Sequence, residues 1–144
     1  MKRVILVAGL LALGVTAALA ESSVVEQRQA LMKQMGGETK TTGGMLRGQE
    51  PFDLAKAQAA LKTISTNAKK ASSLFPESSK ATTEKTEALP AIWDSKATFD
   101  SSFSKLEQDA QAAMSSIKDE ASFKAEFPKV LQNCGTCHKT FRKG

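Results

Sequence analysis

Both cysteines and the only histidine of the chain lie within five consecutive residues near its C-terminal end. Cys134 and Cys137 are separated by two residues, and His138 directly follows the second thiol. A thiol pair at this spacing occurs in thiol–disulfide redox motifs, in halves of zinc sites and, when a histidine follows, in haem c attachment motifs. The residue types therefore admit three kinds of chemistry.

The rest of the sequence favours haem attachment. A structural zinc site needs about four ligands, and the chain has no second group of cysteines or histidines. A thioredoxin-like pair belongs to a βαβ arrangement, and we find no strand pattern. In a haem c site two thiols add across the two vinyl groups, and the adjoining histidine binds the iron. We therefore predict that Cys134 and Cys137 attach one haem c and that His138 is the proximal iron ligand.

The sixth coordination position of the iron cannot be a second imidazole, because the chain has one histidine. The alternatives are Met, Lys, water or an empty position, and electron carriers commonly use Met, which raises the reduction potential. Met32 follows Arg28 by four residues and shares a helix face with Val25, so it is the candidate. Packing in the core is its alternative role. The other methionines beyond residue 20 are expected to fill the core: Met35, Met45 and Met114.

The first twenty residues have the pattern of a secretory signal peptide. Lys2 and Arg3 precede a mostly apolar run over residues 4–17, and the segment ends in Ala-Leu-Ala at residues 18–20. The run is short and rich in Gly and Ala for a membrane span of about 20 residues, although an uncleaved anchor is the alternative. We expect cleavage after residue 20, a periplasmic location, and a single mature domain over residues 21–144 without a membrane segment.

Composition and charge exclude other classes of protein. With 41% hydrophobic and 24% charged residues, the chain has the composition of a globular domain, which excludes wholesale disorder. Removal of Lys2 and Arg3 lowers the formal net charge from +5 to +3. Because no basic stripe interleaved with aromatic residues remains, we expect no binding to nucleic acid.

Four helical patterns fill the mature chain. The first covers residues 22–47, with Ser22 or Ser23 as N-cap, and the second begins after Asp53 and ends before residue 76. Residues 76–95 lack periodicity and are expected to form a long connection. The third helix follows Asp94 or Ser95 and extends to residue 117.

The fourth helix is expected to begin near Glu120 and to carry the Cys–His segment. Pro128 lies inside this pattern, where the missing N–H should kink the helix or mark its true start. Apolar residues recur in steps of three and four in the later helices, and no strand pattern occurs. The sequence thus predicts an all-α antiparallel four-helix bundle, with side-chain sites in its middle.

Several segments carry a resemblance to a known family: residues 28–33 (RQALMK), 48–53 (GQEPFD), 74–76 (LFP), 92–93 (IW) and 134–142. Over residues 22–144 the chain resembles the cytochrome c′ family, also called class II cytochromes c. The resemblance implies an up-down-up-down bundle with one covalently attached haem c. Family members include homodimers, so a monomer and a homodimer are both open.

The resemblance implies two possible behaviours. High-spin members keep a five-coordinate iron and bind small gases such as NO and CO, whereas the low-spin cytochrome c-556 type uses a methionine of the first helix as sixth ligand. The segments LMK, LFP and IW are similar to the second type. The resemblance therefore implies a periplasmic one-electron carrier that serves redox partner proteins, with Met32 as distal ligand. A five-coordinate NO- or CO-binding cytochrome c′ is the alternative. We do not expect an enzyme, because peroxidase-like chemistry would want a second, distal histidine.

The resemblance also implies further haem-binding residues. Arg28 and Gln29 match residues that line the haem and its propionates. Thr86 and Glu87 are the nearest equivalents of a residue that approaches the haem from the long connection. Arg142 matches a basic residue beside the proximal imidazole; its alternative role is a solvated charge that favours the helix dipole.

Overall fold

The computed structural model describes residues 23–144, so the proposed signal peptide lies outside the described residues. The helices are α1 (Val24–Leu46), α2 (Leu54–Ala71), α3 (Ala91–Asp94), α4 (Lys96–Ser116) and α5 (Glu120–Phe141). Two single 3-10 turns, Ser72–Leu74 and Glu77–Ser79, precede α3. Between residues 23 and 144, no helix is long and apolar enough to span a membrane.

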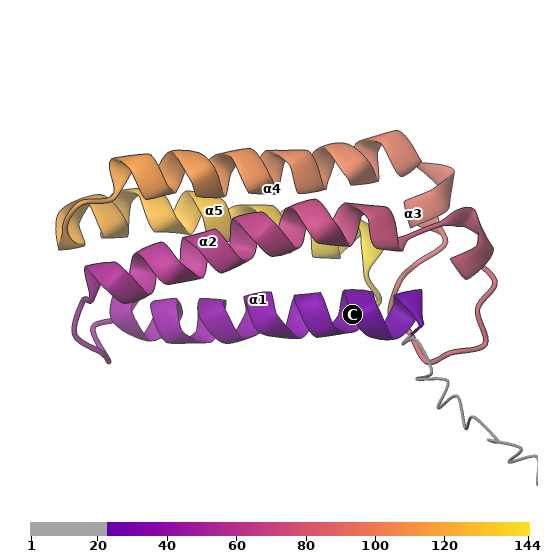
Figure 1. The fold of residues 1–144 in the computed structure, drawn as a ribbon, viewed down its shortest axis with the longest axis horizontal. Coiled ribbons are helices and arrows are strands. Elements are labelled where there is room, and N and C mark those ends of the chain that lie inside the picture. The colour runs from indigo at the N-terminus through magenta and orange to yellow at the C-terminus, as the bar shows by residue number, and fades with distance from the viewer. Residues whose placement is uncertain (1–22) are drawn as a thin grey trace, which may run out of the picture.

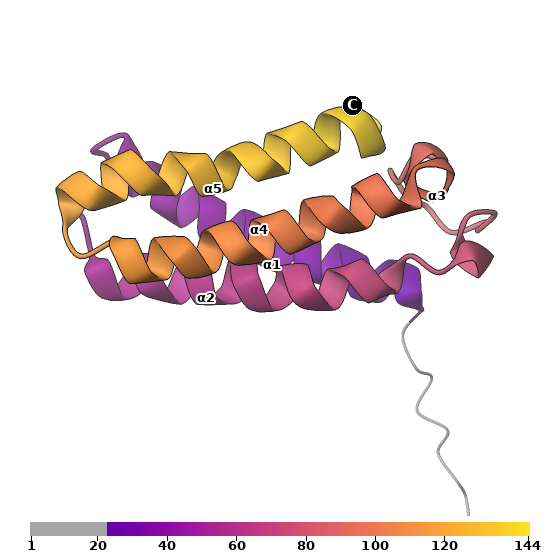
Figure 2. The same cartoon turned by 90° about the horizontal axis from the view of Figure 1, so that it is seen from above.

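The four long helices lie side by side and form the predicted antiparallel bundle (Figures 1 and 2). Helix α1 packs on α2, α2 on α4, and α4 on α5, whereas α1 and α5 approach each other much less. The start of α1, the end of α5 and the short helix α3 lie at the same end of the bundle (Figures 1 and 2). This end is called the open end below. The name refers to the α1–α5 side of the bundle, where the helices pack least closely.

Local sequence signals set two of the helix starts as predicted. The Ser23 hydroxyl accepts a bond from the Glu26 N–H at 3.1 Å, and the Glu26 carboxylate accepts one from the Ser23 N–H at 3.2 Å. This reciprocal pair is a capping box. Asp53 caps α2 by accepting from the Lys56 N–H at 3.0 Å.

The predicted side-chain cap of α4 is wrong. Ser95 precedes α4, but its side chain makes no capping bond. The reason is that α3 runs almost directly into α4, and the Ser95 N–H bonds to the Ala91 carbonyl at 2.9 Å. Within the predicted long connection, residues 76–95, the structure thus contains a short helix whose Ile92 and Trp93 are buried.

Pro128 does not mark the start of α5. The helix begins at Glu120, where Asp119 and Ser122 form a second capping box. Phe123 and Phe127, on the two turns before the proline, are completely buried. Their burial holds those turns in the bundle, so the helix continues through Pro128 although the proline cannot donate a backbone bond.

An aromatic cluster closes the core near the open end. The Phe99 ring lies 4.6 Å from the Phe75 ring, 5.1 Å from Phe103 and 5.1 Å from Phe141, measured between centroids, in edge-to-face geometry. Such pairs add about 0.5–1.5 kcal/mol to the burial of their surface. Because Phe141 is the last residue of α5, the cluster fixes the helix end that carries His138.

One polar contact joins α4 to α5 beside the Cys–His segment. The Asn133 amide, directly before Cys134, donates to the Asp109 carboxylate at 2.8 Å, and Lys105 pairs with the same carboxylate at 2.6 Å. Both contacts stabilise the charged form, and they lower the pKa of Asp109 despite some burial. Asp109 therefore couples the two helices most strongly when it is ionised.

Asp109→Ala is expected to lower the free energy of unfolding of the haem-loaded protein by roughly 1 kcal/mol at neutral pH. Because the pKa of Asp109 in the folded state lies below its unfolded value of about 3.9, this contribution is complete above that value and is lost as the pH falls through the folded pKa. Urea unfolding followed by circular dichroism at several pH values measures it.

Asp100→Ala is the matched control, because Asp100 also pairs with a lysine four residues earlier on α4 but has no bond to α5. Its effect should be smaller, since exposed pairs of this kind contribute little. Equal effects of the two substitutions, or a difference between wild type and Asp109→Ala that persists at low pH, would contradict the assignment.

Candidate haem-binding site

Helix α5 carries the two thiols and the imidazole on its last turns. Residues three and four positions apart lie on one helix face, so Cys134, Cys137 and His138 form one cluster. The same face contributes Val130 and Phe141 to the core, and both are buried. Continuity of α5 from Glu120 to Phe141 therefore sets the direction of all three candidate groups.

The inner face of α5 is incompletely buried over this cluster. Between Val130 and Phe141 no residue of α5 is fully buried, and Cys134 and Cys137 are only half-buried. The two cysteines are free thiols. A groove of about 600 Å³ between α4 and α5 reaches Cys137, but most of the residues that line it are polar or charged, Lys105, Asp109 and Lys129 among them. On the other side, α1 approaches α5 sparsely. Haem attached at the two thiols therefore fits the α1–α5 side better than this groove.

The electrostatics of the thiols do not match a redox-active pair. Burial raises the pKa of Cys134, and burial together with the neighbouring Cys134 raises the pKa of Cys137 to about 11. Thiol–disulfide exchange proceeds through a thiolate whose pKa is usually lowered by its surroundings. Within residues 23–144, no group of three His, Cys, Asp or Glu side chains is arranged to hold a metal ion by itself.

His138 has the protonation state that iron ligation needs. The residue is exposed overall, but partial burial of its ring and the positive charge of Arg142 lower its pKa, while Glu87 acts in the opposite direction. A pKa below the usual value of about 6.5 leaves the imidazole neutral at pH 7. Neutral imidazole has the free nitrogen lone pair that binds a metal.

Arg142 and Glu87 form an ion pair at the end of α5. The Arg142 Nε and Nη2 atoms donate to the Glu87 carboxylate at 2.7 and 2.6 Å. The backbone supports the pair, because the Lys143 N–H donates to the Glu87 carbonyl at 2.8 Å and the Leu89 N–H donates to the Phe141 carbonyl at 3.0 Å. Residues 84–89, called the strap below, therefore lie against the end of α5.

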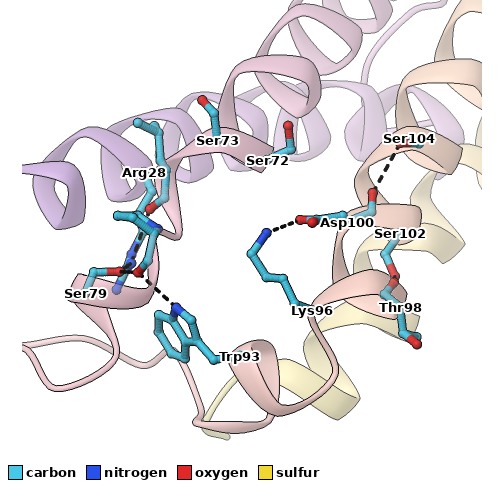
Figure 3. Close-up of polar contacts among 12 residues, drawn as sticks. Arg28, Ser72, Ser73, Ser79, Trp93, Lys96, Thr98, Asp100, Ser102 and Ser104 are labelled. Carbon is cyan, nitrogen blue, oxygen red and sulfur yellow. Dashed lines mark hydrogen bonds and ion pairs between the residues drawn. The ribbon is translucent and has the colours of Figure 1, made fainter.

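Arg28 attaches the other side of the strap to α1. Arg28 is 2% exposed, and its guanidinium donates to the Thr86 hydroxyl at 3.2 Å, the Ser79 hydroxyl at 3.1 Å and the Leu74 carbonyl at 3.3 Å. Figure 3 shows Arg28 pointing from α1 toward the turn that carries Ser79, with the Trp93 indole donating to the same segment. Arg28 thus holds the long connection against α1.

The burial of this arginine is compensated by its neighbours. The guanidinium lies 4.5 Å from the Phe75 ring centroid, a distance typical of cation–π contacts. Burial lowers the pKa of Arg28 and the negative charge of Glu84 opposes that shift, but arginine stays protonated in proteins. Gln29, the next residue, is exposed and donates to the Lys85 carbonyl of the strap at 2.8 Å.

Met32 is half-buried on α1 and packs against the hydrophobic core. Two of the other methionines are buried as expected: Met35 is 6% and Met45 is 2% exposed. Met45 is further engaged, because its sulfur accepts from the Asp53 N–H at 3.4 Å. Met114 is half-buried and also contacts the core.

The structure gathers the sequence-derived candidates at the open end, on α1, on the strap and on α5. It pairs Arg28 with Thr86 and Glu87 with Arg142 directly. Sequence reasoning missed Ser79 as a partner of Arg28, because that residue lies in a stretch without periodicity. The spacing of residues in the sequence could have indicated the burial of Arg28. The residue follows buried Val25 by three positions and precedes buried Met35 by seven on the same helix.

Comparisons with known proteins show the family of the chain. A model of the family described as Cytochrome C' matches residues 23–142. The chain is 48% identical to cytochrome c′ of Rhodopseudomonas palustris, covering 97% of this chain and 95% of the relative. It is 34% identical to cytochrome c-556 of the same bacterium, covering 99% and 97%. The solved structure of that bacterium's cytochrome c′ matches with a TM-score of 0.82 and 46% identity, covering 86% of this chain and 98% of the other. The chain therefore belongs to the cytochrome c′ family, whose members carry covalently attached haem c.

Proposed function

We propose that this protein is a periplasmic one-electron carrier, with its haem c attached through Cys134 and Cys137 and the iron held between His138 and Met32. Residues 1–20 are its signal peptide, and residues 21–144 form the mature haem-binding domain. It exchanges electrons with redox partner proteins. The haem supplies the redox chemistry, and the chain supplies attachment, ligands and an apolar enclosure.

The observation that carries the proposal is the incomplete burial of α5 around its Cys–His segment. Both thiols are half-buried and the imidazole is exposed, although the same helix face is buried at Val130 and Phe141. The two thiols supply the sulfur atoms for two thioether bonds, and a neutral imidazole supplies the lone pair for ligation. The aromatic residues around Phe99 exclude water from the adjacent core, which favours a low reorganisation cost during electron transfer.

The position of Met32 along the bundle supports its role as distal ligand. Met32 lies eight residues from the start of α1, about 12 Å along its axis, and Cys134 lies seven residues from the end of α5, about 10 Å along it. Because both ends lie at the open end (Figure 1), Met32 is at a level similar to that of Cys134, whereas His138, three residues from the end of α5, lies about 4.5 Å along the helix from that end. Met45 and Met114 lie near the opposite end, by the α1–α2 and α4–α5 turns.

A second candidate function is gas binding by a five-coordinate iron, with Met32 as an apolar cover over the distal position. The observation in its favour is the higher identity to the relative named cytochrome c′, 48%, than to the relative named cytochrome c-556, 34%. The two functions share the attachment residues and differ in the bond between iron and the Met32 sulfur. Substitution of Met32 therefore separates them.

The attachment residues are tested by mass and colour. When the protein is made in a host with cytochrome maturation, its mass should exceed that of the mature polypeptide by one haem. The double variant Cys134→Ala/Cys137→Ala should carry no covalent haem, because no thiol remains to add to a vinyl group. Thr136→Ala, an exposed position between the two cysteines, is the control and should keep the haem. Wild-type protein with the mass of bare polypeptide would refute the attachment.

The distal ligand is tested by absorption spectra of the ferric protein. Met32→Leu and Met32→Ala should change a low-spin spectrum to a high-spin one, since neither side chain has a sulfur ligand. Leucine keeps most of the apolar volume of methionine, so Met32→Leu shows the effect of losing the iron–sulfur bond without a large loss of packing. Leu31→Ala, a half-buried neighbour on α1, should leave the spectrum low-spin.

Carbon monoxide provides the independent measurement. The reduced wild-type protein should bind CO slowly or weakly at neutral pH, because the gas must displace Met32, and the Met32→Ala variant should bind it faster. Rapid, tight binding by the wild type, together with an unchanged spectrum of Met32→Leu, would establish the gas-binding function instead.

A further inference from the structure

We propose that Glu87 is a positioning residue for the redox centre: its carboxylate holds the Arg142 guanidinium beside His138 and offsets the positive charge there. The pair then contributes little net charge to the surroundings of the iron. This inference rests on the proposed role of His138 as proximal ligand. It assigns to the strap a part in setting the reduction potential.

The geometry fixes both members of the pair relative to the imidazole. Arg142 follows His138 by one helical turn, and its N–H donates to the His138 carbonyl at 3.0 Å. Glu87 is held by the Lys143 N–H, and the adjoining residue, Ala88, forms an isolated antiparallel bridge with Arg142. The ion pair at 2.6 Å thus sits on a backbone that already joins the two segments.

The strap is anchored on its other side as well. Thr86, next to Glu87, accepts from the buried guanidinium of Arg28, and the Lys85 carbonyl accepts from Gln29. The carboxylate of Glu84 accepts from the Ser23 hydroxyl at 2.6 Å. Three consecutive contacts with α1 therefore precede the ion pair, so Glu87 approaches α5 from a fixed segment.

The two charges act on His138 with opposite signs. Arg142 lies one helical turn after His138, and Glu87 pairs with it at 2.6 Å, so both charges lie close to the turn of α5 that carries the imidazole. Reduction of ferric to ferrous iron removes one positive charge from the centre. A nearby cation consequently favours the ferrous state and a nearby anion favours the ferric state, and the paired side chains oppose each other. Because both are about half exposed, 52% for Arg142 and 58% for Glu87, salt weakens the effect.

The test measures the reduction potential of the haem-loaded protein at low ionic strength. Glu87→Gln leaves the Arg142 charge unopposed, so the potential should rise. Arg142→Gln leaves the Glu87 charge unopposed, so the potential should fall. The double variant removes both charges and should return close to the wild-type potential. High salt should reduce all of these differences.

The control is Glu120→Gln, which removes the same charge from the other end of α5. Glu120 lies eighteen residues before His138, about 27 Å along the helix, which exceeds the Debye length of about 10 Å at 0.1 M salt. The reduction potential of the Glu120→Gln variant should therefore equal that of the wild type at moderate salt. The potentials of all variants are also measured under this condition.

Three results would overturn the inference. Glu87→Gln and Arg142→Gln could shift the potential in the same direction, as a general loosening of the open end would cause. The reduction potentials of both variants could equal that of the Glu120→Gln control. The absorption spectrum of Glu87→Gln could show a change of ligation, which a purely electrostatic role does not produce. A wild-type spectrum without a histidine-ligated haem would instead refute the proposed function, and it is recorded before any variant is compared.

Discussion

The row of buried residues along α5 is interrupted between Val130 and Phe141, and the rest of the structure depends on this constraint. A bundle helix is stabilised by burying one apolar face, yet α5 buries nothing completely between Val130 and Phe141. Leu131, Cys134 and Cys137 of this stretch are only half-buried, and burial of apolar surface contributes about 25 cal/mol per Å². A haem c attached at the two cysteines, as we propose, would cover this remaining apolar surface. In this family the cofactor is consequently part of the core as well as the redox centre.

Polar contacts of a buried arginine, and not the apolar core, hold the segments together at the open end. Burying an arginine is unfavourable unless its donors are satisfied, and Arg28 meets this condition with three oxygen acceptors and the face of Phe75. These contacts join α1 to the long connection, and the strap then joins that connection to α5. Helices α1 and α5, which carry the candidate ligands Met32 and His138, thus depend on one segment for their spacing, although they touch each other sparsely.

Much of the fold could be predicted from the sequence because its signals are local. The stripes of α2, α4 and α5, the capping box at Ser23 and the Asp53 cap each involve residues within a few positions of one another. The Ser95 cap was wrong because α3 runs almost directly into α4. Pro128 does not mark the start of α5 because the burial of Phe123 and Phe127 holds the preceding turns in the bundle. The strap pairs residues 55 positions apart, and no local pattern records such a pairing. The resemblance did indicate Thr86, Glu87 and Arg142, but not the contacts that join them.

The shared fold narrows the question of function to one side chain. Relatives named cytochrome c′ and cytochrome c-556 both align with nearly the whole chain, so the bundle itself does not select between an open and a filled sixth position. Function is decided at the site that a fold carries. Met32 packs against the core as a half-buried residue, and a methionine has enough rotatable bonds to exchange one set of contacts for another without moving its helix. Iron ligation by Met32 therefore depends on whether the iron–sulfur bond outweighs the core contacts that the thioether gives up.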